Sequence, residues 1–338
     1  MADPEVRRLE RLAEELAESG LELQRSDVHG NMVLDEVDRA MRPPVHEGRV
    51  ASSGSIIEPV SDSAGWASGT QLGITRGELG QVSLNAARRF ADGLSSWLIR
   101  RADGGNEWVI FDRPAGSERD LVVLAGSFDA VVVQRHPAGT VRVVSPAGIH
   151  RWAGMGWHHE PPISDWLDTL AIDRPTLDGD VLEALLAFAV HDLGSRGIGA
   201  LLVYRPQYPD PGPPVEERLP APPPLSILRP PQLAPLRHAL AQTDGATFFD
   251  DAGLLSGLGV RLVPSRRAEQ SVDALGGTRH TSGCRYSFDD PDAIVVAVSE
   301  SGPVTVFQAG AVLGTSGGHR WSPRGLDVDD DPTSFPTH

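Results

Sequence analysis

Four short segments in the second half of the chain carry residue types suited to binding a phosphorylated ligand. Asp244-Gly245-Ala246 combines a carboxylate, which can hold a divalent cation or accept a hydroxyl proton, with a glycine that permits close backbone approach. Gly276-Gly277-Thr278-Arg279-His280 offers a hydroxyl, a guanidinium and an imidazole to phosphate oxygens at a possible helix start. Ser299-Glu300 ends one apolar run, and Gly199-Ala200-Leu201 begins another. Together they indicate nucleotide chemistry.

Each segment also has an ordinary structural interpretation. Asp-Gly is common in turns, and a glycine pair can end one helix before a capped helix that carries Arg279 and His280 on its surface. Ser299-Glu300 can begin a hairpin turn, and residues 199–203 can form a plain core strand. The order and spacing of the four segments are therefore more informative than any one of them.

That order resembles the diadenylate cyclase (DAC) domain, the catalytic module of the DNA-integrity-scanning protein and its membrane-bound relatives. The resemblance covers about residues 176–314, where GALLV, DGA, GTRH and SE occur in succession. It implies a mixed sheet flanked by helices that condenses two ATP into cyclic di-AMP, a bacterial second messenger, with release of pyrophosphate. It also implies a homodimer or higher homo-oligomer, because each ATP is held by one of two protomers that meet face to face.

The resemblance assigns roles to residues by position. Asp244 would orient or deprotonate the 3′-hydroxyl and, with Glu300, hold Mg²⁺ or Mn²⁺. Asp244, Arg279 and His280 would be the catalytic residues, and Arg279 and His280 would hold the phosphates. The implied nucleotide-binding residues are Gly199, Ala200, Leu201, Gly245, Ala246, Gly277, Thr278 and Ser299.

The chain departs from the family pattern at two places. Thr281 follows Arg279-His280 where the family has a second arginine, so one cation is absent unless Arg285, Arg266 or Arg267 replaces it. Glu300 is followed by Ser301, where the family often has a second acid. The leading hypothesis is a diadenylate cyclase, a nucleotidyltransferase. The alternatives are a catalytically weak or inactive nucleotide-binding sensor on the same fold, and a scaffold that uses helix 4–19 and the Pro-rich segment for docking.

The elements that must position these residues follow from apolar patterning. In the C-terminal block, helices are expected at 178–193, 236–242 and 266–275, and strands at 199–204, 246–249, 293–299 and 304–310. In the N-terminal block, helices are expected at 4–19 and 83–101, and strands at 108–112, 120–126, 129–135 and 140–144. The predicted fold class is α/β, an α+β mixed sheet flanked by helices, preceded by a smaller α/β domain.

The expected organisation has four parts. Residues 1–45 form an N-terminal helical segment, 46–160 a sensor or regulatory domain with an unknown ligand, 161–325 the DAC-like domain, and 326–338 an acidic disordered tail. The Pro-rich stretch 205–235 is interpreted as a surface excursion within the third part. Residues 129–149 also resemble residues 292–312, and each copy is followed by His-Arg-Trp. This echo indicates either two related folds or merely two valine-rich hairpins.

Composition limits the remaining possibilities. The 338 residues suggest about two domains. The formal charge of −16 disfavours broad binding to nucleic acid or an anionic membrane, and no apolar run is long enough to span a bilayer. A single cysteine excludes an intrachain disulfide and favours a reducing, cytoplasmic location. His158-His159-Glu160 is expected in a surface loop, and the GxSxG-like run at 314–318 lacks the context of a nucleophile elbow.

Overall fold

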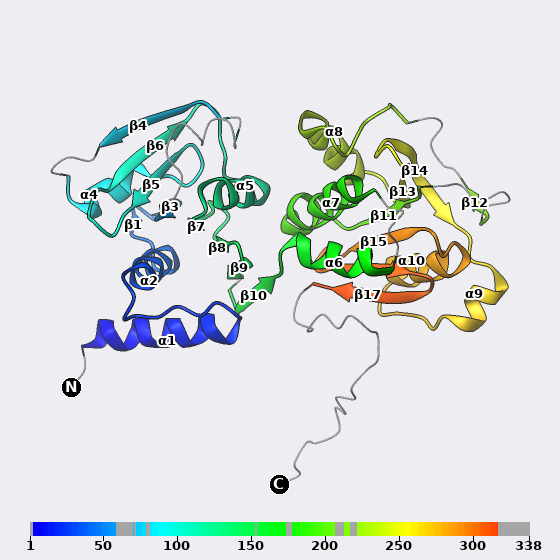
Figure 1. Cartoon of the computed structure of the whole chain (residues 1–338), viewed down its shortest axis with the longest axis horizontal. Coiled ribbons are helices and arrows are strands. Elements are labelled where there is room, and N and C mark those ends of the chain that lie inside the picture. The colour runs from blue at the N-terminus through cyan, green and yellow to red at the C-terminus, as the bar shows by residue number, and fades with distance from the viewer. Residues whose placement is uncertain are drawn as a thin grey trace, which may run out of the picture. The chain divides into compact units, whose positions relative to one another are not determined.

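A computed structural model of the chain divides into two compact units, Met1–Pro162 and Ile163–His338, each built around one large sheet (Figure 1). The structure describes residues 3–58, 70, 72–78, 82–152, 154–173, 178–206, 213–216 and 222–316. The predicted acidic tail, the second His-Arg-Trp run and parts of the Pro-rich stretch lie outside these residues. Each unit is described separately below.

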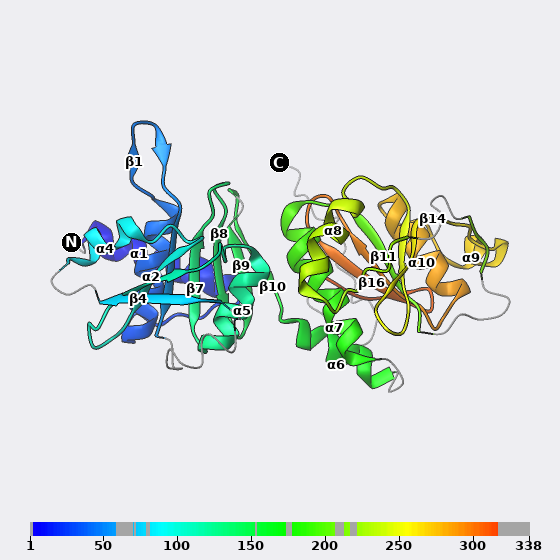
Figure 2. The same ribbon diagram turned by 90° about the horizontal axis from the view of Figure 1, so that it is seen from above.

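The N-terminal unit has an eight-stranded sheet in the order β10-β9-β8-β7-β3-β5-β6-β4. Its helices are α1 (Pro4–Glu18), α2 (Val28–Met41), α4 (Leu84–Ala87), the short 3₁₀ helix η1 (Arg88–Phe90) and α5 (Glu118–Phe128). Its strands are β3 (Ser53–Ile57), β4 (Ile74–Glu78), β5 (Ser96–Arg100), β6 (Glu107–Phe111), β7 (Val131–Arg135), β8 (Val141–Ser145), β9 (Gly148–Trp152) and β10 (Trp157–Glu160). Two further strands, β1 (Val45–His46) and β2 (Arg49–Val50), form a hairpin that extends away from this sheet (Figure 2).

The C-terminal unit has a seven-stranded sheet in the order β12-β14-β13-β11-β15-β16-β17. Its helices are α6 (Ile163–Asp173), α7 (Gly179–Ala187), which continues into the π-helical turn η2 (Phe188–Leu193) and the 3₁₀ turn η3 (Gly194–Arg196), α8 (Pro230–Leu240), α9 (Arg266–Ser271) and α10 (Thr278–Asp289). Its strands are β11 (Ala200–Tyr204), β12 (Val215–Glu216), β13 (Ala246–Phe249), β14 (Leu255–Leu262), β15 (Ile294–Val298), β16 (Val304–Gln308) and β17 (Ala311–Thr315). The mixed α/β architecture predicted from the sequence is confirmed.

Both faces of each sheet are covered by helices, and apolar side chains alternate between the two faces. In the C-terminal unit, Leu202 and Val296 pack toward α7, whereas Leu201 and Val295 pack toward α10. In the N-terminal unit, the face toward α1 and α2 buries residues such as Val133. The opposite face, toward α5, has its own core. Strands buried on both sides explain the nearly continuous valine runs in the sequence.

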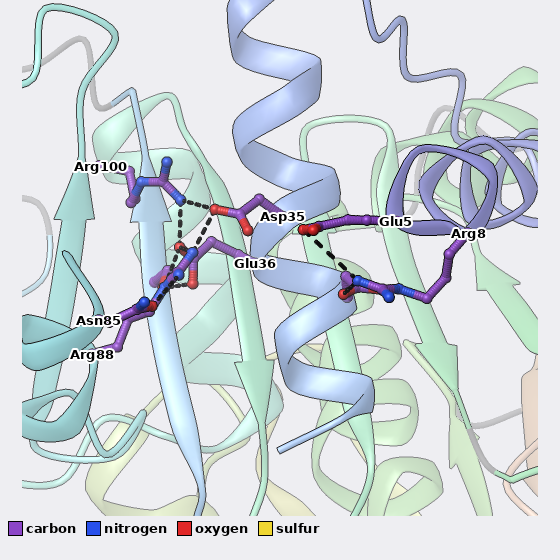
Figure 3. A network of polar contacts seen from close by, with 9 residues as sticks. Glu5, Arg8, Asp35, Glu36, Asn85, Arg88 and Arg100 are labelled. Carbon is purple, nitrogen blue, oxygen red and sulfur yellow. Dashed lines mark hydrogen bonds and ion pairs between the residues drawn. The ribbon is translucent and has the colours of Figure 1, made fainter. Parts of the chain in front are cut away.

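A buried polar cluster fastens α2 to the N-terminal sheet (Figure 3). Glu36, on α2, is only 4% exposed. Its carboxylate accepts hydrogen bonds from Ser55 Oγ at 2.9 Å, Arg88 Nη2 at 2.6 Å and Arg100 Nη1 at 2.5 Å. Asp35 binds the same two arginines. The charges of this cluster are therefore paired, as burial requires.

Two predictions in the N-terminal block are wrong. Residues 120–126 form the middle of α5 rather than a strand, because Ser117 and Asp120 make a capping box and Leu121, Leu124 and Phe128 share one buried face. The helix expected at 83–101 stops at Phe90. The carboxylate of Asp92 then accepts backbone N–H bonds from residues 94–96, and β5 follows.

Three smaller expectations also need correction. Helix α8 begins at Pro230, inside the stretch expected to be irregular, because prolines are tolerated in a helix's first turn. The helix expected at 266–275 ends at Ser271. His158-His159-Glu160 lies in strand β10 instead of a loop, and the His159 ring stacks on His150 with centroids 4.5 Å apart.

Candidate nucleotide site

A cavity of about 780 Å³ opens in the C-terminal unit where β11, β13 and α10 begin and where β14 and β15 end. Most of the residues singled out in the sequence line it. They are Leu201, Asp244, Gly245, Ala246, Gly277, Thr278, Arg279, His280, Ser299 and Glu300. Segments separated by up to a hundred residues are therefore brought to one end of one sheet.

The start of α10 supplies the positive side of this cavity. Gly277 is the N-cap of the helix, and its first turn contains Thr278, Arg279 and His280 with no acidic residue. The unpaired N–H groups and partial positive charge of a helix start favour an anion there. This arrangement suits phosphate oxygens.

Glu300 forms an ion pair with Arg279 at the lining of the cavity. Arg279 Nη1 donates to Glu300 Oε1 at 3.1 Å, and both side chains remain substantially exposed. Such a pair is weak in water, so either partner can be released to a ligand or cation. The pair thus keeps the guanidinium and the carboxylate beside the cavity, and both groups stay available to a ligand.

His280 contacts one threonine, which is bonded to a second. Its Nε2 lies 3.3 Å from Thr305 Oγ1, which in turn lies 3.1 Å from Thr315 Oγ1. Burial, with a further contribution from Arg279, lowers the pKa of His280 below its usual 6.5. The ring is therefore neutral at neutral pH in the ligand-free chain, and a bound phosphate would favour its protonation.

Asp244 and Gly245 connect α8 to β13. Gly245 has φ +105°, and a Cβ there would lie 2.8 Å from the backbone of Gly259. Only glycine fits such a backbone position without strain, so the backbone conformation requires a glycine directly after Asp244. Asp244 lines both this cavity and a neighbouring one of about 420 Å³, as do Arg279 and Glu300.

Gly199 and Ala200 do not line the larger cavity. Gly199 lines the smaller cavity, where a Cβ would overlap Arg279 Nη1 and approach Glu300 Cγ. Ala200 is 6% exposed and belongs to the core on the α7 side of the sheet. The absence of a side chain at Gly199 thus leaves room for the Arg279–Glu300 pair.

The arginines considered as replacements for a cation at position 281 do not line the cavity. Arg285 Nε donates to the carbonyl oxygen of Val272, and the Arg267 guanidinium lies 5.5 Å from the centre of the Phe288 ring. Thr281 uses its hydroxyl to close the preceding loop, since it bonds both the N–H and the carbonyl of Leu275.

Sequence reasoning missed the contribution of β14. Val260, Arg261 and Leu262 line the cavity, as do Ser282 and Val298 and the already expected Gly276. Arg261 pairs with Glu216 of β12 at 3.3 Å, which brings the Pro-rich excursion to the cavity's edge. The antiparallel pairing of β13 with β14 places these residues there, and no local motif signals it.

The donor set at this site fits a hard divalent cation. Asp244 and Glu300 present carboxylates to the same space, and Mg²⁺ commonly binds one or two carboxylates while the substrate phosphates and water complete its shell. Within the described ranges, no cluster of three or more His, Cys, Asp or Glu side chains could hold a metal by protein ligands alone.

Comparison with protein families identifies both units. Residues 188–312 match the family described as "DisA bacterial checkpoint controller nucleotide-binding", the DAC family. The C-terminal unit is a DAC domain. Residues 10–160 match the family described as "Probable sensor domain DACNK". The DAC domain is thus preceded by a sensor-type domain, as the sequence predicted.

Solved structures with similarity to the chain include two bacterial proteins. One, a hypothetical membrane spanning protein from Bacillus cereus, is 17% identical over 46% of this chain and 89% of its own, with a TM-score of 0.30. The other, a double mutant of DacA from Staphylococcus aureus, is 21% identical over 39% of this chain and 83% of its own, with a TM-score of 0.27. No curated protein matches the chain. Among the described helices, none has the length and apolarity needed to cross a bilayer.

Proposed function

We propose that this chain is a diadenylate cyclase that converts two ATP into cyclic di-AMP and two pyrophosphates, under regulation by its N-terminal unit. The observation that carries the proposal is the convergence of Asp244, the α10 start and Glu300 on one cavity of a DAC domain. The cavity joins a base, a phosphate-binding helix start and cation ligands, as nucleotidyl transfer requires.

The chemistry assigns roles to these groups, two of them to Asp244. Asp244 accepts the proton as the 3′-oxygen of one ATP forms a bond to the α-phosphorus of the other. The bond from that phosphorus to the bridging oxygen breaks, and pyrophosphate leaves. Arg279, His280 and the N–H groups at the start of α10 hold the phosphates in line. Mg²⁺ or Mn²⁺, held by Asp244 and Glu300, would neutralise charge on the phosphates.

Two active sites must meet for this reaction, because each ATP supplies the nucleophile for the other. We therefore propose that two protomers pair through their DAC domains, and that product formation per protomer rises with protein concentration until dimers predominate. Analytical ultracentrifugation and initial rates over the same concentration range test this. Activity that is independent of concentration in a strictly monomeric protein would exclude the mechanism.

A nucleotide-binding sensor without turnover is the second candidate, and Thr281 is the observation that favours it. Its hydroxyl is used to close the 275–281 loop, so no cation stands at the position where the family has one. A Thr281→Arg variant distinguishes the two. Under the cyclase proposal the wild type already makes product, whereas under the sensor hypothesis only the variant gains activity.

A further inference from the structure

The first seven strands of the N-terminal sheet, β3 to β9, have the same topology as the seven strands of the C-terminal sheet, and only β10 has no counterpart. In each, the first strand lies between the third, which is parallel to it, and the fifth, which is antiparallel. The fourth strand lies between the third and the second and is antiparallel to both. The fifth, sixth and seventh strands form an antiparallel meander. The corresponding pairs, in chain order, are β3/β11, β4/β12, β5/β13, β6/β14, β7/β15, β8/β16 and β9/β17.

The helices correspond as well. A helix pair precedes the first strand in each unit, and a helical segment (α4 with η1, or α8) precedes the third. Helix α5 joins the fourth strand to the fifth in the N-terminal unit, and α9 and α10 do so in the C-terminal unit. Helix α5 packs on β7 and β8, as α10 packs on β15 and β16. The echo between residues 129–149 and 292–312 falls on these fifth to seventh strands. One fold therefore occurs twice in the chain.

Strand register identifies which residues correspond near the cavity. In both units the last residue of the fifth strand pairs with the first residue of the first strand. These pairs are Arg135 with Ser53 in the N-terminal unit and Val298 with Ala200 in the C-terminal unit. One residue earlier, a row crosses three strands. In the C-terminal unit the row is Ala297, Thr305 and Thr315, and in the N-terminal unit it is Gln134, Arg142 and Arg151.

This row contacts the first turn of the following helix in both units. In the C-terminal unit Thr305, itself bonded to Thr315, lies against His280 of α10, which lines the cavity. At the same positions, Arg151 binds Glu118 through Nη2 at 2.5 Å and Nε at 2.7 Å, and Arg142 Nε lies 3.4 Å from the same carboxylate. Glu118 is the first residue of α5, as Thr278 is of α10, and it is 1% exposed.

The connection before α5 closes the remaining space. Gln134 Nε2 donates to the carbonyl oxygens of Gly93, at 2.7 Å, and Gly116, at 2.9 Å. The segment from β6 to α5 is short, whereas the one from β14 to α10 includes α9 and the glycines at 276–277. The first turn of α5 also carries Glu118 and Asp120, so its charge is opposite to that of the α10 start.

We propose that the N-terminal unit is a diverged second copy of the DAC fold in which the buried Glu118 carboxylate fills the space beside the helix start that the His280 side chain occupies in the C-terminal unit. Arg142 and Arg151 bind this internal anion, and the unit is closed to nucleotides at that position. The chain therefore binds one nucleotide, in its C-terminal unit. The identity of that nucleotide rests on the proposed function, whereas the internal anion position does not.

Anion rescue in the full-length chain tests the internal position. Glu118→Ala leaves Arg142 and Arg151 beside a helix start, with Glu160 of β10 as the remaining carboxylate on Arg151. Hydrogen exchange in α5 and β8 should therefore rise, and inorganic phosphate should slow it more than chloride of equal ionic strength. Glu183→Ala, at an exposed helical site of the C-terminal unit, is the matched control and should show no phosphate-specific effect in these segments. Equal responses to phosphate in both variants would overturn the proposal.

If Glu118→Ala does not fold, the number of nucleotides bound per chain tests the closed site instead. Calorimetry with α,β-methylene-ATP should give one site per wild-type chain and none in Arg279→Ala. Nucleotide protection of α5 in Arg279→Ala would overturn the closed site. If the wild type binds no nucleotide at all, the proposed function fails, and protection of α5 by phosphate in a folded Glu118 variant still decides the internal anion position.

Discussion

Arg279 and Glu300 meet over the backbone of Gly199, where their side chains make a 3.1 Å hydrogen bond. A methyl group on Gly199 would overlap the guanidinium, so Gly199→Ala should displace Arg279 and lower cyclic di-AMP formation by about tenfold to a hundredfold. Because the displaced group is the end of a flexible side chain, folding should change little. Gly179→Ala, where a Cβ meets nothing within 4 Å, is the control. Equal rates for the two variants would refute this role for Gly199.

The Glu36 cluster should control the stability of the N-terminal unit. Glu36→Ala leaves Arg88 and Arg100 buried with less negative charge, and breaking a buried pair in this way costs about 3–5 kcal/mol. Chemical denaturation should show the earlier unfolding, and Glu14→Gln, at an exposed position on α1, should leave the midpoint unchanged. A loss below about 1 kcal/mol, the range of surface pairs, would contradict the assignment.

His150 should make the N-terminal unit sensitive to acid. Burial, then the neighbouring His159, lowers the pKa of His150 to about 4, while its Nε2 donates to the carbonyl of Ser19 at 3.1 Å. The unfolded chain binds a proton near pH 6.5, so stability should fall as the pH drops from about 6.5 toward 4, by up to about 3 kcal/mol. His150→Gln should flatten this slope in urea titrations, and an unchanged slope would exclude His150 as the cause.

Thr305 should matter through His280. Thr305→Val keeps the shape of the side chain but removes the hydroxyl that lies 3.3 Å from His280 Nε2. We expect product formation to fall several-fold and its pH profile to shift, while the thermal midpoint stays within a few degrees. Thr315→Val, one step further from the ring, should have a smaller effect. A lower midpoint without a changed pH profile would indicate a purely structural role.

The sequence predicted the strands β11, β13, β15 and β16 because these segments are short and apolar. The motif order also indicated which segments would converge. The α5 region was misassigned because Val122 and Val123 favour a strand locally, whereas the capping box at Ser117 determines the helix. The β14 side of the cavity could not be predicted, since the register shifts within the β13–β14 hairpin decide which side chains reach the cavity. The equivalence of Arg142 with Thr305 likewise required the register.

The most direct test of the account is incubation of the purified chain with ATP and Mn²⁺ or Mg²⁺, followed by mass spectrometry of the products. The account predicts cyclic di-AMP and pyrophosphate from the wild type and from Asp251→Asn, an exposed control, and a loss of product in Asp244→Asn. Equal product from Asp244→Asn and the wild type would contradict the assigned site. Tight ATP binding without any product would contradict the cyclase itself.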